Sequence, residues 1–163
     1  MLSLLLNMDN IEIVCAENRD LDQILILLNE ITESIRSTKG WNSYSLSTQK
    51  ESQRKIFLEI LKSEGRLFVA KYNGRIVGLV NMQVVYNIRH GWKRAHLEEV
   101  VVNKEFRRNS IGSKLIKAVA NYCKDNNIGV IKLLCGKQLK TSLKFYKTNG
   151  FKFTDEGLRL DVK

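Results

Sequence analysis

The residues best suited to chemistry lie in one continuous stretch, where an apolar run leads through a basic turn into a helix. Val100–Val102 is β-branched and predicts the end of a strand, and Arg107 and Arg108 follow in a polar turn. From Ile111 onwards, apolar residues recur at three- and four-residue spacing, which predicts a helix. The first turn of a helix has unpaired N–H groups and the positive end of the helix dipole, and the arginines add charge beside it. The stretch therefore predicts an anion site, and a phosphate-bearing ligand suits it best.

The elements that must position this stretch alternate between strands and helices along the chain. Asn73-Gly74 separates two apolar strands and is the strongest short signal for a β-hairpin. The whole pattern predicts the order βααβββαβαββ, which favours one α/β domain with a mixed sheet flanked by helices. Strands are expected at 11–15, 67–72, 75–85, 94–102, 130–135, 151–153 and 158–162, and helices after Asp20, after Ser47, at 111–126 and at 143–148.

Composition and charge limit the classes of partner. The 163 residues carry a net charge of +10, which favours an anionic partner: a nucleic acid, an acidic surface or a polyphosphate ligand. The charge is spread along the chain, which argues against a dedicated basic tail. Three cysteines without paired spacing predict reduced thiols, and neither a disulfide framework nor a metal site follows from them. The apolar stretch 1–7 is too short to cross a membrane and lacks the features of a secretory signal. We therefore expect a cytoplasmic protein with no membrane partner, a leader or extension at 1–10 and one domain at 11–163.

Two motifs, in this order and on these elements, resemble the GNAT superfamily of acetyl-coenzyme A-dependent N-acyltransferases. Arg107-Arg108-Asn109-Ser110-Ile111-Gly112 is similar to the family's Arg/Gln-x-x-Gly-x-Gly/Ala pyrophosphate loop between a strand and a helix. Phe145-Tyr146-Lys147-Thr148-Asn149-Gly150-Phe151 resembles the family's Phe-Tyr-x-x-x-Gly-Phe signature. With the opening strand and helix at 11–31, the resemblance covers the chain from Ile11 onwards. It implies the GNAT fold, a single domain with a mixed, mostly antiparallel central sheet flanked by helices.

The chain departs from the family pattern at two positions. Ser110 stands where the family normally has its first glycine, and Leu139 stands where it often has an asparagine. Glycine lets the backbone approach the pyrophosphate closely, whereas serine adds a side chain and a hydroxyl. We expect cofactor binding to survive with a rearranged contact. The departures also leave a second interpretation open, a GNAT-like binding or regulatory domain that holds an acyl-coenzyme A without turnover.

The resemblance implies acetyl-coenzyme A (acetyl-CoA) as co-substrate and no metal. The backbone N–H groups of the turn would hold its pyrophosphate, and the residues concerned are Arg107, Arg108, Asn109, Ser110, Ile111, Gly112 and Ser113. The preceding strand end, Val100, Val101 and Val102, would pair with the pantetheine arm like an added strand. The N–H of Val102 would polarise the thioester carbonyl.

The resemblance also implies candidates for proton transfer. Tyr146 matches the family's tyrosine near the sulfur and is the candidate general acid for the leaving thiolate. Glu98 and Glu99 match an acidic pair in many family members, and one of them is expected to act as the base, directly or through a water. Adjacent strand residues point to opposite faces, and His96 shares a face with Glu98 if the strand is regular. Because a β-bulge would reverse that alignment, the base remains open among the three.

The function implied by the resemblance is transfer of an acetyl group from acetyl-CoA to a primary amine of a small molecule or protein, by direct attack on the thioester. The acceptor cannot be identified from the sequence. A nucleic-acid-binding protein is disfavoured because the charge is dispersed and no motif for such binding is present. The sheet edges and the apolar hairpin at 76–85 leave a homodimer open.

Overall fold

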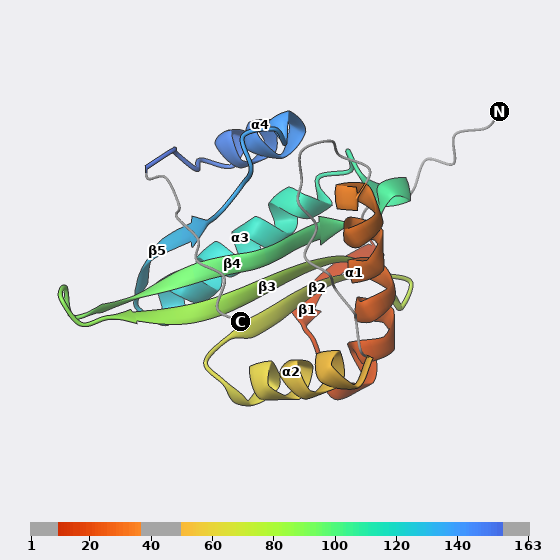
Figure 1. Cartoon of the computed structure of the whole chain (residues 1–163), viewed down its shortest axis with the longest axis horizontal. Coiled ribbons are helices and arrows are strands. Elements are labelled where there is room, and N and C mark those ends of the chain that lie inside the picture. Colours follow the sequence, from red (N-terminus) through yellow and green to blue (C-terminus); the bar gives the residue numbers. More distant parts are fainter. Residues whose placement is uncertain (1–9, 37–49, 155–163) are drawn as a thin grey trace.

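The computed structural model describes residues 10–36 and 50–154, which form a five-stranded sheet with helices on both faces (Figure 1). The strands are β1 (Ile11–Cys15), β2 (Arg66–Tyr72), β3 (Arg75–Asn87), β4 (Trp92–Val102) and β5 (Ile128–Leu133). The α-helices are α1 (Leu21–Arg36), α2 (Lys50–Lys62), α3 (Ile111–Asp125) and α4 (Lys140–Thr148). Two short 3-10 helices, η2 (Asn18–Asp20) and η3 (Lys104–Phe106), precede α1 and α3.

The strands follow one another across the sheet in the order β1-β2-β3-β4-β5. The first three pairs are antiparallel, and β4 and β5 are parallel because α3 crosses between them. This topology confirms the mixed, mostly antiparallel sheet expected from the sequence. Asn73 and Gly74 join β2 to β3 with φ values of 49° and 77°, the left-handed conformations that a tight hairpin turn requires.

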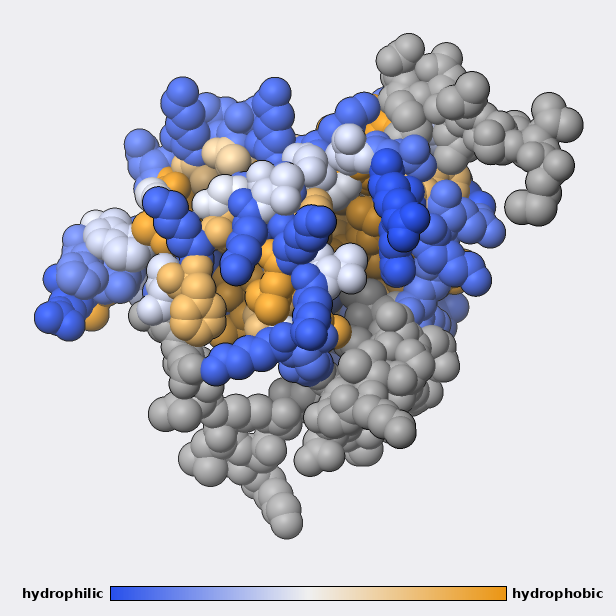
Figure 2. Space-filling model, turned by 90° about the horizontal axis from the view of Figure 1, so that it is seen from above, coloured by the Kyte–Doolittle hydropathy of each residue, from blue (hydrophilic) through white to orange (hydrophobic). Residues whose placement is uncertain are grey.

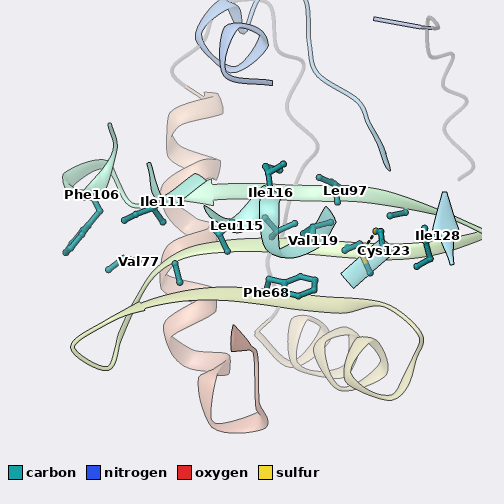
Figure 3. Packing of buried hydrophobic residues seen from close by; sticks show 14 residues of the cluster. Phe68, Val77, Leu97, Phe106, Ile111, Leu115, Ile116, Val119, Cys123 and Ile128 are labelled. Atoms are coloured by element: carbon teal, nitrogen blue, oxygen red, sulfur yellow. Dashed lines mark hydrogen bonds between the residues drawn. The ribbon is translucent and has the colours of Figure 1, made fainter. Parts of the chain in front are cut away.

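Each face of the sheet has its own buried layer. On one face, α3 packs Leu115 and Val119 against β2, β3 and β4, together with Phe68 and Leu97 (Figure 3). On the other face, α1 and α2 cover a second cluster, which includes the fully packed side chains of Leu21, Ile24, Leu27, Phe57 and Leu79. One face of each helix is buried against the sheet, and this face carries the apolar residues that recur at helical spacing in the sequence.

A buried ion pair fixes the entry into α1. The side chain of Asp20 is 5% exposed, and its two carboxylate oxygens lie 2.8 and 3.0 Å from Nζ of Lys71 on β2. The same carboxylate accepts the backbone N–H of Glu17 at 2.9 Å. Burial raises the pKa of Asp20, but these hydrogen bonds outweigh it, so the pKa lies below its ordinary value. Asp20 therefore ties α1 to the sheet from the end of η2.

The end of the described chain corrects one predicted strand. Phe151–Phe153 has no regular secondary structure. Gly150 ends α4 with a φ of 87°, and the N–H of Phe151 returns to the carbonyl of Tyr146 at 3.0 Å, which is the hydrogen bond of a Schellman cap. Phe151 thus closes a helix instead of joining the sheet. The predicted strand at 158–162, the predicted helix cap Ser47 and residues 1–9 of the predicted leader lie outside the described residues.

Candidate active site

The end of β4 has a free edge among the described strands (Figure 1). Pairing with β5 ends at Leu97–Leu133, whereas β4 continues to Val102. The N–H of Asn103 donates to the carbonyl of Val77 on β3 at 2.9 Å. Because backbone groups alternate along a strand, the N–H of Val102 points away from β3, towards the free edge. Such an edge can hydrogen-bond an extended ligand as an additional strand.

The turn after β4 leaves the start of α3 without a side-chain cap. Arg108 and Ser110 both have positive φ values, 64° and 58°. Ser110 is the N-cap residue of α3, and its side chain makes no capping hydrogen bond. The N–H groups of the first turn of α3 are thus left for another acceptor. Arg107 braces the turn, since its Nε donates to the carbonyl of Val102 at 2.9 Å.

The conformation of Ser110 explains why its position favours glycine. A φ of 58° lies in the left-handed region, which costs a residue with a Cβ about 1–2 kcal/mol. Serine therefore preserves the backbone path of the turn at the expense of some strain. The Ser110 hydroxyl lies at the N-terminus of α3, and a rearranged contact with the cofactor stays a prediction.

The two sequence motifs touch each other at Gly112. A Cβ built on Gly112 would lie 2.9 Å from Cζ of Phe145 and 3.8 Å from Cγ2 of Val102. Only glycine lets the aromatic ring of α4 pack this closely on the first turn of α3. Gly112 thus has a role in docking α4, in addition to its predicted place in the ligand-binding turn.

Basic side chains surround this part of the molecule. α4 exposes Lys140, Lys144 and Lys147, which recur at helical spacing, and Arg107 and Arg108 are exposed in the turn. Viewed from the α4 side, hydrophilic side chains stand around a strip of apolar surface (Figure 2). The local charge therefore favours an anionic ligand at the turn.

A β-bulge decides how the two glutamates point. Asn81 of β3 pairs with Glu99 and Met82 pairs with Leu97, so Glu98 is the extra residue without a partner on β3. Before the bulge, Leu97 packs into the α3 layer, whereas after it Val101 packs into the α1–α2 layer. Regular alternation would put positions 97 and 101 on one face. The bulge thus turns Glu99 towards the α1–α2 side, so of the regular and the bulged strand considered above, β4 is the bulged one.

Glu99 has the more perturbed environment of the two carboxylates. Burial raises its pKa, a hydrogen bond from Asn81 lowers it, the charge of Glu98 raises it, and the net shift is upward. Nδ2 of Asn81 donates to Oε2 of Glu99 at 2.6 Å. Glu98 is exposed, and its Oε1 lies 3.6 Å from Nε2 of His96. Asn81 was not predicted as part of the site, although a polar amide within the apolar run of β3 was a signal for a polar partner on the neighbouring strand.

Tyr146 lies on α4, between two aromatic rings. The ring centroids of Phe145 and Phe151 are 5.2 and 5.6 Å from that of Tyr146. Burial, with a smaller contribution from the nearby thiol of Cys135, raises the pKa of Tyr146 to about 12. Its hydroxyl therefore stays protonated at neutral pH and can donate a proton or a hydrogen bond.

Neither a metal centre nor a membrane-crossing helix is found in the described part of the chain. No group of three or more His, Cys, Asp or Glu side chains within residues 10–36 and 50–154 could hold a metal ion. Cys15, Cys123 and Cys135 are free thiols, and burial raises the pKa of Cys123 to about 11. None of the helices in these two ranges is long and apolar enough to span a bilayer.

Comparison with known proteins identifies the family. The model of the acetyltransferase (GNAT) family matches residues 27–151. The chain belongs to the GNAT family of acetyltransferases. Membership of this family indicates that the protein is an acyltransferase, and the family uses acetyl-CoA as co-substrate.

Individual relatives agree with this assignment. An uncharacterized N-acetyltransferase of Methanocaldococcus jannaschii is 29% identical over 136 residues, which is 81% of this chain and 56% of that protein. The GNAT chain thus spans little more than half of that relative. Glucosamine 6-phosphate N-acetyltransferase of Trypanosoma brucei brucei is 25% identical over 94% of this chain and 97% of its own length. The crystal structure of a Trypanosoma brucei acetyltransferase superposes with a TM-score of 0.71 at 23% identity, covers 93% of this chain and 99% of that one, and supports the fold.

Proposed function

We propose that this GNAT protein transfers the acetyl group of acetyl-CoA to a primary amine, on a small molecule or a protein, by direct attack of the amine on the thioester. The observation that carries the proposal is the construction of β4. One end of this strand has a free edge leading into an anion-binding turn, and its bulge turns a carboxylate of raised pKa to the opposite side from α3. In this proposal β4 would bind acetyl-CoA along its free edge and would place the base for the acceptor amine at its bulge.

The residues of the turn and strand fit the two parts of acetyl-CoA. The first-turn N–H groups of α3, with Arg107 and Arg108, suit its pyrophosphate, and the free edge at Val100–Val102 suits the amides of its pantetheine arm. When bound, acetyl-CoA supplies the acetyl thioester that is the electrophile of the reaction. The N–H of Val102, which points to the free edge, is our candidate donor to the thioester oxygen.

We assign the general base to Glu99 and not to Glu98 or His96. The attacking amine must lose a proton for the amide product to form. A carboxylate of raised pKa accepts that proton more effectively near neutral pH. Glu99 has such a pKa and is held by Asn81. Glu98 is exposed, and its negative charge raises the pKa of Glu99. His96 lies beside Glu98.

We assign the general acid to Tyr146. A pKa of about 12 keeps its hydroxyl protonated, so it can give a proton to the leaving thiolate. The packing of Phe145 on Gly112 supports this role, because it docks α4 directly on the turn that would hold acetyl-CoA.

Two measurements test the proposal in sequence. Acetyl-CoA should raise the melting temperature, since a ligand that binds the folded state stabilises it. A thiol-release screen should then find a primary amine that is acetylated, and glucosamine 6-phosphate, other amino sugars, polyamines and peptides make up the panel. A melting shift without release from any amine would favour the non-catalytic acyl-CoA-binding alternative. The absence of a shift at millimolar acetyl-CoA would contradict both.

A further inference from the structure

A chain of two amides leads to the carboxylate of Glu99 along β3. Nε2 of Gln83 donates to Oδ1 of Asn81 at 2.6 Å, and Nδ2 of Asn81 donates to Oε2 of Glu99 at 2.6 Å. All three side chains are only partly exposed. Both amides follow the alternation of β3, whose intervening residue Met82 is fully packed on the opposite face.

The direction of this chain is fixed by chemistry. An ionised carboxylate accepts hydrogen bonds and donates none, so Asn81 must turn its NH₂ group towards Glu99. Its oxygen then faces Gln83, which must donate in turn. The remaining oxygen of Gln83, Oε1, lies 2.8 Å from where a Cβ of Gly65 would stand, so a larger residue at Gly65 would displace it.

We propose that Asn81 and Gln83 are positioning residues, which act through Glu99 by holding its Oε2 and leaving Oε1 to take the proton of the acceptor amine. The inference rests on the proposed role of Glu99 as base. Oε1 of Glu99 has no hydrogen-bond partner within the described chain. Gln83 matters because it keeps the amide of Asn81 from rotating, and it does so without touching the carboxylate.

Among the described residues, the strands beside Glu99 carry the following charged groups. On β4, Glu98 raises the pKa of Glu99, and His96 lies 3.6 Å from Glu98. On β5, Lys132 stands opposite His96 in the parallel pairing. The side chains that face Glu99 from β3 are the neutral amides, so substitutions there change its pKa through hydrogen bonding unless they add a charge.

The test is a pH titration of the Glu99 carboxyl by carbon NMR on the full chain without ligands. Asn81→Leu should raise the titration midpoint by about one pH unit, because a hydrogen bond to the charged form is lost. Gln83→Leu should raise it less, because Asn81 can still donate. Asn121→Asp, on the exposed side of α3 across the sheet, is the control for added charge and should leave the midpoint unchanged.

Gln83→Glu separates positioning from simple charge. A glutamate at this position cannot donate, so it should force Asn81 to rotate and turn Oδ1 towards Glu99. The midpoint should therefore rise further with Asn81 present than in an Asn81→Leu background, where only the added charge acts. Equal shifts in the two backgrounds, or no shift in Asn81→Leu, would overturn the positioning role. Melting curves identify variants that do not fold. If Gln83→Glu does not fold, Gln83→Leu takes its place, and its shift of the Glu99 midpoint is compared with Asn81 present and in the Asn81→Leu background.

Failure of the base role is detected separately. Glu99→Gln should lower acetyl transfer to the amine found in the thiol-release screen. Wild-type transfer by this variant would overturn the proposed base, and with it the functional meaning of the chain of amides. The titration, by contrast, requires neither acetyl-CoA nor an acceptor, so a negative titration result contradicts the positioning role alone.

Discussion

Gly112→Ala probes the contact that joins the two motifs of the site. The new Cβ would stand 2.9 and 3.0 Å from Cζ and Cε2 of Phe145, roughly 0.5–1 Å closer than carbon atoms normally pack. The ring, and with it α4, must shift, and overpacking of this kind costs about 1–3 kcal/mol. Alanine in place of glycine within a helix returns about 1 kcal/mol. We expect the free energy of unfolding to fall by up to about 2 kcal/mol, and turnover to fall because Tyr146 moves with α4.

Urea unfolding measures this change, and the chain offers a matched control. A Cβ on Gly129 of β5 would meet nothing within 4 Å, so Gly129→Ala should stay within about 0.5 kcal/mol of the wild type. In a Phe145→Leu background the clashing ring atoms are absent, and Gly112→Ala should cost at least about 1 kcal/mol less than in the wild type. An equal cost in both backgrounds would refute the reasoning.

Three further predictions follow from the titrating groups. Tyr146→Phe should lower kcat about 10²-fold with little change in the affinity for acetyl-CoA measured by calorimetry, and an unchanged kcat would remove Tyr146 from the mechanism. In the pH profile of kcat/KM, the midpoint of the acid limb should lie above pH 4.5, because the pKa of Glu99 is raised above the ordinary glutamate value of 4.5. A midpoint at or below pH 4.5 would contradict the assignment of Glu99. The stabilisation from Asp20, whose folded pKa lies below 3.8, should be present above that pH and lost as the pH falls through the folded pKa. Asp20→Asn, which leaves Lys71 buried without its counter-charge, should therefore cost about 3 kcal/mol at neutral pH and flatten the acid side of the stability curve; parallel stability curves would count against this ion pair.

Local signals predicted most of the fold and the backbone elements that carry the candidate site. The Asn73-Gly74 turn and the passage from Val100–Val102 to the helix at Ile111 depend on neighbouring residues, and both appear where the sequence places them. The strand predicted at Phe151–Phe153 failed because alternating apolar residues can also close a helix. Residue pattern alone does not distinguish these two uses of Phe151.

The remaining features of the candidate site depend on contacts between distant segments. The bulge at Glu98 arises from the pairing of β4 with β3, so adjacency in the sequence could not reveal that Glu99 points to the α1–α2 side. The bond from Asn81 to Glu99 and the contact of Phe145 with Gly112 each join residues far apart in the chain. Sequence motifs pointed to the two glutamates and the turn as candidates, whereas only the tertiary structure shows which side chains hydrogen-bond to them.

The decisive experiment for Glu99 as the general base compares acetyl transfer by the wild type and by Glu99→Gln, measured as thiol release at saturating acetyl-CoA and neutral pH. We expect the wild type to release thiol with at least one primary amine and the variant to be slower by about 10²-fold or more, with acetyl-CoA binding retained by both. Equal rates in the two proteins, or binding of acetyl-CoA without transfer to any amine, would contradict this expectation.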